Sequence, residues 1–460
     1  MIRKRIFKAV EGVSNIELFY DLIFVYCISI ITSLCHHLQG DFLDWGTWGI
    51  YMFSFLVVLQ VWFFTTFLMN RYGDRSASDN ICLFINMFLL YFLASGIRTD
   101  WENTFFTFNI AWALILVNLL VHWAIKRVRY TNLDEDDKSI MNMTIVVLAM
   151  QLVIVTTAAF LPTAPSEIAS WVGLAFGMGV FARNKAYRRK DSRFGHLAER
   201  CSLLVIIAFG ETIVAIATYM TGASTIAYSI LVFALVVGLF LIYIYEHDNM
   251  LDHHRKSDGR AFLTVTGWLI LVIGNLTVGL EFMPDPEVAF LPKSLFLMAW
   301  LVLYLLTSFV LGFWNKPEFH YTKAFLAGRL GTCAFIVIVA FATNFNPMVN
   351  LICDTAAVYF ALWHEWLIYH SRTKLMAFGR SIGFDDEEMI EAGHSVRTRE
   401  GRKAMADVYR EVRDVVGREG MAQGLRDGGE SLSDACKESI REKVISRVEG
   451  VDTGESAERE

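Results

Sequence analysis

The sequence predicts an all-α integral membrane protein with about twelve transmembrane helices and a charged cytoplasmic tail. Of its 460 residues, 55% are hydrophobic and only 19% are charged. In a soluble protein roughly a quarter of all residues are charged. The surplus apolar residues fall in runs close to the roughly 20 residues that cross a hydrocarbon core. A backbone exposed to lipid must satisfy its own hydrogen bonds, so each run is expected to be a helix.

The first expected membrane half covers residues 15–182 and follows a basic N-terminus at 1–14. No small-residue cleavage site follows its first apolar run, which is therefore expected to remain as a span. The six expected spans are 15–34, 47–69, 80–96, 104–125, 140–161 and 167–182. A basic loop at 183–198 comes next.

The second expected membrane half covers residues 199–369. Its six expected spans are 199–220, 226–245, 261–281, 291–313, 327–345 and 349–369. An even number of spans in each half gives both halves the same orientation, which fits a parallel repeat about an axis normal to the membrane. Residues 370–460 alternate in charge and carry amphipathic patterns, which predicts a cytoplasmic tail of helical and disordered segments.

The basic residues give the expected topology. With a cytoplasmic N-terminus, the N-terminal segment and the inner loops carry 21 Lys and Arg residues, and the outer side has only Arg98 and Lys293. One misplaced span would invert every later loop, so the asymmetry supports twelve spans with both termini cytoplasmic. The plasma membrane is the expected location and the lipid bilayer the expected partner. The basic loops follow the topology, so nucleic-acid binding is not expected, and the oligomeric state is not predicted.

Two acids stand at the head of the first span, in the stretch "ELFYDLIF" at 17–24. Ser14 and Glu17 fit a capping box, which accounts for Glu17 alone. Asp21 lies deeper, where an ionisable group costs a few kcal/mol on insertion scales. Because Glu17 and Asp21 are one helical turn apart, we expect both to point into the bundle interior.

The seventh span carries the next acids. Glu211 lies near its middle beside Gly210, and Glu199 and Arg200 lie at its inner end. An acid at the depth of Glu211 is neutral, paired with a buried donor, or in contact with water or a cation. Supporting polar candidates on other spans are Arg329, as a buried counter-charge, and Asn275.

Two segments together resemble a known family. "ELFYDLIFVYCIS" at 17–29 and "FGHLAERCSLLVIIAFGETIVAI" at 194–216 are similar to the signatures E-L-F-x-D-L-x-F-V and H-x-x-E-R…G-E of the bacterial low-temperature-requirement A (LtrA) family. Cys201 and Ser202 depart from the aromatic–Gly pair expected after E-R. The resemblance covers about residues 10–375 and implies a helical membrane fold, not a substrate. It also implies the signature positions, which are Glu17, Asp21, His196, Glu199, Arg200 and Glu211.

A further polar stretch, "EHDNMLDHH" at 246–254, follows the eighth span. Its metal-ligand candidates are His247, Asp248, Asp252, His253 and His254. No H-E-x-x-H or comparable spacing is present, so a solvated face beside the membrane is favoured over a metal or proton-sensing site. No cofactor is predicted.

These features predict a secondary transporter or ion-conducting protein that binds a cation or proton at intramembrane carboxylates. We expect these carboxylates to face one shared hydrophilic interior where the first and seventh spans meet. Two alternatives stay open. The acids can instead fix helix register in a structural or stress-adaptation protein, or serve a lipid-handling enzyme. The sequence contains no P-loop and no G-x-S-x-G turn with a nucleophile and base, so an enzyme is not the expectation.

Overall fold

The structure, a computed structural model, describes residues 12–36, 44–217, 223–316, 319, 321–342 and 346–381, together with 403, 407 and 410. Within these residues the chain forms twelve α-helices and no β-strand. The helices are α1 (Asn15–Ser33), α2 (Trp45–Tyr72), α3 (Ala77–Ser95), α4 (Trp101–Arg129), α5 (Glu135–Ala159), α6 (Thr163–Arg183), α7 (Phe194–Ala217), α8 (Ala223–Tyr245), α9 (Arg260–Phe282), α10 (Phe290–Leu311), α11 (Lys323–Ala342) and α12 (Pro347–Ser381). Short 3-10 helices lie at Leu34–His36, Lys185–Arg189 and Gly312–Trp314, and a π-helix at Glu246–Met250 follows α8.

The helical membrane class is confirmed. Ten helices in the described ranges are long and apolar enough to cross a membrane, all except α6 and α12. Each α-helix overlaps one of the twelve expected spans, but the crossing of α6 and α12 stays a prediction. The N-terminal residues 1–11 lie outside the described residues, as does the tail from 382 onward apart from its three described positions.

Several helices begin earlier than their apolar runs. α3 begins at Ala77, α5 at Glu135 and α7 at Phe194, so His196 is on a helix rather than in the basic loop. Polar residues at these starts satisfy exposed amides, as Asp134 does for Asp137 at the head of α5. Hydropathy alone detects the lipid-facing length of a helix and misses such polar ends.

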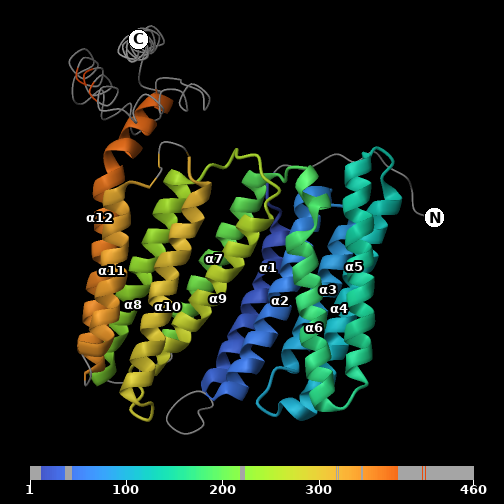
Figure 1. The fold of residues 1–460 in the computed structure, drawn as a ribbon, viewed down its shortest axis with the longest axis horizontal. Helices are drawn as coiled ribbons and strands as arrows, with labels where there is room; N and C mark the ends of the chain where they lie inside the picture. Colours follow the sequence, from blue (N-terminus) through green and yellow to red (C-terminus); the bar gives the residue numbers. More distant parts are fainter. Residues whose placement is uncertain are drawn as a thin grey trace. The chain divides into compact units, whose positions relative to one another are not determined.

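The described chain divides into two compact units. The first comprises Met1–Leu241, His253–Leu311 and Cys333–Val358, and the second Ile242–Asp252, Gly312–Thr332 and Tyr359–Glu460. In the first unit α1 packs against α2, α3, α7 and α9 (Figure 1). α2 is the most buried of the ten apolar helices, because 89% of its most apolar 18-residue stretch is buried. It also contacts α4, α6, α7 and α9.

The buried polar residues of α3 point inward, and a row of its apolar side chains points outward. Asp79 and Asn86 on α3 are buried. Its exposed apolar side chains recur at helical spacing, at Ile81, Phe84, Ile85, Phe88 and Phe92. A lipid environment stabilises this arrangement, whereas water would leave a large apolar patch exposed.

A buried amide pair joins α2, α5 and α6. Gln151 Nε2 donates to Gln60 Oε1 at 2.8 Å, and both side chains are almost fully buried. The pair lies against Gly177, where an added Cβ would come within 2.5 Å of Gln151 Oε1 and closer still to Gln60 Nε2. Only a residue without a side chain fits at this crossing.

The second unit is held by backbone pairing and aromatic packing. Leu251 and Asn315 form an isolated antiparallel bridge, and the N–H of Lys316 donates to the Met250 carbonyl at 2.7 Å. The ring of Tyr369 packs against those of Phe319 and Phe325 at centroid distances of 6.0 and 5.6 Å.

Candidate functional site

The site begins at the N-terminus of α1. Ser14 Oγ accepts the N–H of Glu17 at 3.2 Å, and Glu17 Oε2 accepts the N–H of Ser14 at 2.9 Å, which confirms the predicted capping box. Only one carboxylate oxygen of Glu17 is used in this way. The other is free to face the bundle interior, where Glu17 is only 3% exposed.

Asp21 lies one turn further along α1 and is fully buried. Arg200 on α7 donates to it twice, from Nε to Oδ2 at 3.1 Å and from Nη2 to Oδ1 at 2.9 Å. Trp62 on α2 donates its indole N–H to Oδ1 at 3.0 Å. Three donors therefore offset the desolvation of this carboxylate, and the two-point Arg contact fixes its orientation.

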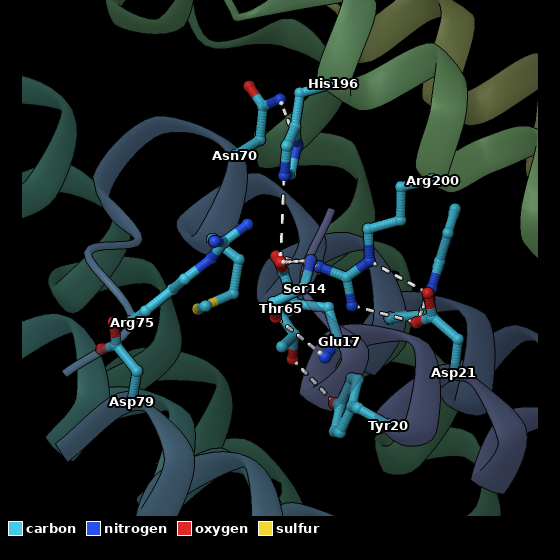
Figure 2. A network of polar contacts seen from close by, with 12 residues as sticks. Ser14, Glu17, Tyr20, Asp21, Thr65, Asn70, Arg75, Asp79, His196 and Arg200 are labelled. Carbon is cyan, nitrogen blue, oxygen red and sulfur yellow. Dashed lines mark hydrogen bonds and ion pairs between the residues drawn. The ribbon is translucent and has the colours of Figure 1, made fainter. Parts of the chain in front are cut away.

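The Arg200 guanidinium also faces Glu17, with Nη1 3.5 Å from Oε1 (Figure 2). It lies 5.8 Å from the centre of the Tyr20 ring, whose hydroxyl donates to Thr65 at 3.0 Å. Arg200 is fully buried. Glu17 and Asp21 thus share one guanidinium inside the bundle.

His196, one turn before Arg200 on α7, completes the arrangement. Its Nε2 lies 3.9 Å from Glu17 Oε2, and its Nδ1 lies 3.3 Å from Asn70 Nδ2. Asn70 can only donate from that nitrogen, so His196 Nδ1 accepts and the proton of the neutral ring is on Nε2, toward Glu17. We call Glu17, Asp21, His196 and Arg200 the α1–α7 cluster.

Two expected members do not join this cluster. Glu199 is exposed, because it is one residue and therefore about 100° around the helix from Arg200. Glu211 is half-buried and makes no hydrogen bond or ion pair with the described residues. It follows Arg200 by eleven positions, which is about 16 Å along an α-helix. The acids expected to share one interior are therefore only partly brought together.

A second acid–base group lies between α3 and α4. Lys126 Nζ is 2.6 Å from Asp74 and 2.6 Å from Asp79, and His122 Nε2 is 2.9 Å from Asp79. Lys126 and Asp79 are fully buried. Two acids, one base and one histidine repeat the composition of the α1–α7 cluster. Hydropathy places Asp79 and Lys126 at the ends of spans. The only signal for an inward position is helical spacing, because Asp79 lies three residues before Cys82 and Lys126 four residues after His122.

Arg329 is buried, as the sequence predicted for a counter-charge, and its partners lie in the second unit. Its Nη2 is 2.8 Å from Glu246 Oε1 and 2.7 Å from Glu365 Oε2. Glu365 is 1% exposed and was not singled out from the sequence. Glu365 lies four residues after Ala361 and four before Tyr369, and both of these are buried. This helical spacing indicates that Glu365 faces inward.

Two further buried polar residues lie in the first unit. Asn275 on α9 donates to the Leu271 carbonyl at 2.9 Å, and its Oδ1 has no hydrogen-bond partner among the described residues. Asp354 on α12 is 1% exposed and accepts one hydrogen bond, from Asn350 at 2.5 Å. Neither side chain belongs to the α1–α7 cluster.

The metal-ligand candidates after α8 differ in exposure. His247 Nδ1 lies 3.0 Å from Asp248, while Asp248 and His254 are exposed and Asp252 and His253 are half-buried. Among the described residues no group of three or more His, Cys, Asp or Glu side chains could hold a metal ion.

A bundle of apolar helices around buried acid–base groups defines a multi-pass helical membrane protein. The chain belongs to the family described as bacterial low temperature requirement A protein (LtrA), which matches residues 12–364 and confirms the resemblance seen in the sequence. An uncharacterized protein of Rhizobium meliloti (strain 1021) is 24% identical over 283 residues, which cover 57% of this chain and 65% of that protein. The match thus spans less than two thirds of that relative's length. No solved structure matches the chain.

Proposed function

We propose that this protein is a secondary transporter or ion-conducting protein that binds a proton or small cation at the α1–α7 cluster. One observation carries the proposal, namely that the buried carboxylates of Glu17 and Asp21 share the single guanidinium of Arg200. Ionisable groups inside a membrane domain are costly, and they mark ion pathways and proton relays more often than packing.

The charge of the cluster supports this role. Two carboxylates face the buried guanidinium of Arg200, and Arg193 is a further cation within electrostatic reach of Glu17. Glu17 lies 3.5 Å from Arg200 and 3.9 Å from His196, so it is held less closely than Asp21, which receives the two-point contact. The looser pairing leaves the Glu17 carboxylate available to one small cation or proton, which is the step that a proton- or cation-coupled transporter requires.

The proposal includes the finer topology. It places twelve spans in two six-helix halves of the same orientation, with both termini cytoplasmic, in the plasma membrane. The 21 basic residues of the N-terminal segment and the inner loops, against two on the outer side, support this arrangement. No catalytic step is part of the proposal, and a contribution to growth in the cold would follow from transport.

A second candidate function is structural. The two-point hydrogen bonding between Arg200 and Asp21 fixes the register of α7 against α1 and would do so in a protein that moves nothing. Under this alternative the cluster binds no ion during function.

Flux measurements in proteoliposomes test the proposal. Purified protein is reconstituted with an internal pH dye, and uptake is driven by proton, sodium or potassium gradients. Glu17→Gln is the informative variant, because glutamine keeps the capping box and removes the charge. We expect at least a tenfold loss of flux with Glu17→Gln, and unchanged flux with the control Glu199→Gln, whose side chain is exposed.

Three results would overturn the assignment. If a folded Glu17→Gln variant has wild-type flux, the α1–α7 cluster is not part of the ion pathway. Loss of flux in Asp79→Asn but not in Glu17→Gln transfers the role to the α3–α4 group. No flux under any gradient, combined with a large loss of stability in Asp21→Asn, supports the structural alternative.

A further inference from the structure

A cavity of about 250 Å³ lies away from the α1–α7 cluster, where α2, α4 and α6 begin. These helices start at the same end of the first unit, the lower end in Figure 1. Five aromatic side chains line the cavity, together with one carboxylate, that of Glu167. The aromatic residues are Trp45, Phe53, Trp101, Phe105 and Trp171.

Helical spacing brings these residues to one place. Trp45 and Phe53 are eight positions apart on α2, Trp101 and Phe105 four apart on α4, and Glu167 and Trp171 four apart on α6. Residues at such intervals share a helix face, so three helices each present one such face to the cavity.

The rings form walls at different angles rather than one stack. The Phe53 centroid lies 4.9 Å from that of Trp171 and 6.3 Å from those of Trp101 and Phe105, with interplanar angles of 55°, 80° and 48°. An outward-facing belt of interfacial aromatics is the ordinary reason for Trp at a helix end in a membrane protein. Here Phe53, Trp101 and Phe105 are at most 7% exposed, so their rings face the protein interior, whereas Trp45 (86% exposed) and Trp171 (40% exposed) form the open rim of the cavity.

The charge of the cavity is negative. Glu167 is half-buried and forms no hydrogen bond or ion pair with any described residue, and no Lys, Arg or His is among the lining residues. Three helix N-termini meet here and would by themselves favour an anion. Asp44 already occupies the start of α2, where it accepts the N–H groups of Gly46 and Thr47. The carboxylate of Glu167, which has no partner within the described part of the chain, then makes the site attractive to a cation.

We propose that this cavity binds a quaternary ammonium group. Aromatic faces set at angles around one carboxylate recognise such a cation through its diffuse positive charge, and they supply none of the several oxygen ligands that a hard metal ion takes. The volume is below the roughly 300–1,000 Å³ of sites for drug-sized ligands, which fits a small headgroup. The group can come from a free solute such as choline or from a phosphatidylcholine headgroup. The proposal does not depend on the α1–α7 cluster.

Gly49 provides the sharpest variant for a test. It lines the cavity, and a Cβ added to it would meet no atom within 4 Å. Gly49→Ala is therefore expected to add a methyl group without displacing a neighbour, and Gly49→Met extends a longer side chain from the same position to occupy the hollow. Glu167→Gln removes the charge alone. Glu102→Gln is the matched control, because Glu102 is an exposed acid beside Trp101.

The experiment is calorimetric titration of the full chain, in a maltoside detergent, with tetramethylammonium and with choline. We expect saturable binding to wild type, at least fivefold weaker binding to Glu167→Gln, none to Gly49→Met, and unchanged binding to Glu102→Gln and to Glu17→Gln. Nanodiscs of phosphatidylcholine and of phosphatidylglycerol distinguish the sources. Weaker tetramethylammonium binding only in phosphatidylcholine indicates a lipid headgroup, and equal binding in both indicates a free solute.

Either of two results overturns the proposal. Equal affinity of wild type, Glu167→Gln and Gly49→Met places any binding elsewhere. Binding of sulfate that Gly49→Met abolishes, with no binding of tetramethylammonium, assigns the cavity to an anion. If Gly49→Met elutes as aggregate, Gly49→Ala and Glu167→Gln decide, because the cation assignment requires both to bind more weakly.

Discussion

Arg200 Nη2 lies 2.9 Å from Asp21 Oδ1 while its Nε lies 3.1 Å from Oδ2, so the guanidinium and the carboxylate meet as two parallel hydrogen bonds. Both side chains are fully buried. A lysine cannot reproduce this fork, because its ammonium acts as a single point charge. The contact therefore sets the relative position of α1 and α7 as well as balancing a charge.

Removing one partner of the Asp21–Arg200 pair should lower the free energy of unfolding far more than removing both partners. Arg200→Met leaves Asp21 and Glu17 buried without a cation, so we expect a loss of about 3–5 kcal/mol in the free energy of unfolding. The double variant Asp21→Asn/Arg200→Met should recover much of that loss. Unfolding in mixed micelles, followed by circular dichroism, measures both. Additive losses in the double variant would show that the two side chains are not coupled.

Two substitutions of Glu17 should separate its capping role from its charge. Glu17→Gln keeps an acceptor for the N–H of Ser14, and Glu17→Ala removes it. We expect Glu17→Ala to lower stability by about 0.5–2 kcal/mol more than Glu17→Gln does, by analogy with the loss of other helix caps. Thermal melts of the two variants in the same detergent compare them directly. Equal stability would mean that the capping box contributes nothing measurable.

Two glycines on α6 should respond oppositely to alanine. Gly177→Ala places a methyl group against the Gln60–Gln151 amide pair, so we expect a loss of about 1–3 kcal/mol from overpacking. Gly179→Ala is the matched control, because an added Cβ there meets nothing within 4 Å. Alanine is the better helix former by roughly 1 kcal/mol, so Gly179→Ala should be neutral or stabilising. A stable Gly177→Ala would show that the amide pair can move aside.

The pH dependence of one surface contact can be predicted in sign. The cap hydrogen bond from the Asp137 N–H, followed by the contact with Lys190, lowers the pKa of Asp134. A lowered pKa in the folded state means that the carboxylate contributes stability above its unfolded pKa, about 3.9, and loses it as the pH falls through the folded value. Asparagine caps a helix equally well, so Asp134→Asn isolates the charge.

We expect wild type to melt slightly above Asp134→Asn at pH 7, because the side chain is largely exposed, and the gap to close below about pH 4. Melting temperatures at pH 3, 4, 5 and 7 test this. A gap that stays constant across that range would exclude titration of Asp134 as its source.

The apolar runs predicted the helices because burial in lipid requires a minimum length of apolar chain. The depth of Asp21 marked it as inward-facing for the same physical reason. The contact between the first and seventh helices was expected, and the structure confirms it. The two-point pairing of Asp21 with Arg200 was beyond the sequence, because periodicity gives the face of each helix but not which donor meets which acceptor. Lys126 and Asp79 were missed since each lies at a span end, where a charge is ordinarily solvated. Glu199 and Arg200 were predicted together as signature positions at the inner end of the seventh span, although a helix turns about 100° between them.

The separation of Asp21 and Arg200 in the chain, 179 positions, has a consequence for biogenesis. Synthesis at about 5–20 residues per second leaves roughly 9–36 s between the emergence of the two residues from the ribosome. During that interval Arg200 is not yet present to pair with Asp21. The first helix must then carry Asp21 in protonated form or remain beside the insertion machinery until the seventh helix is inserted.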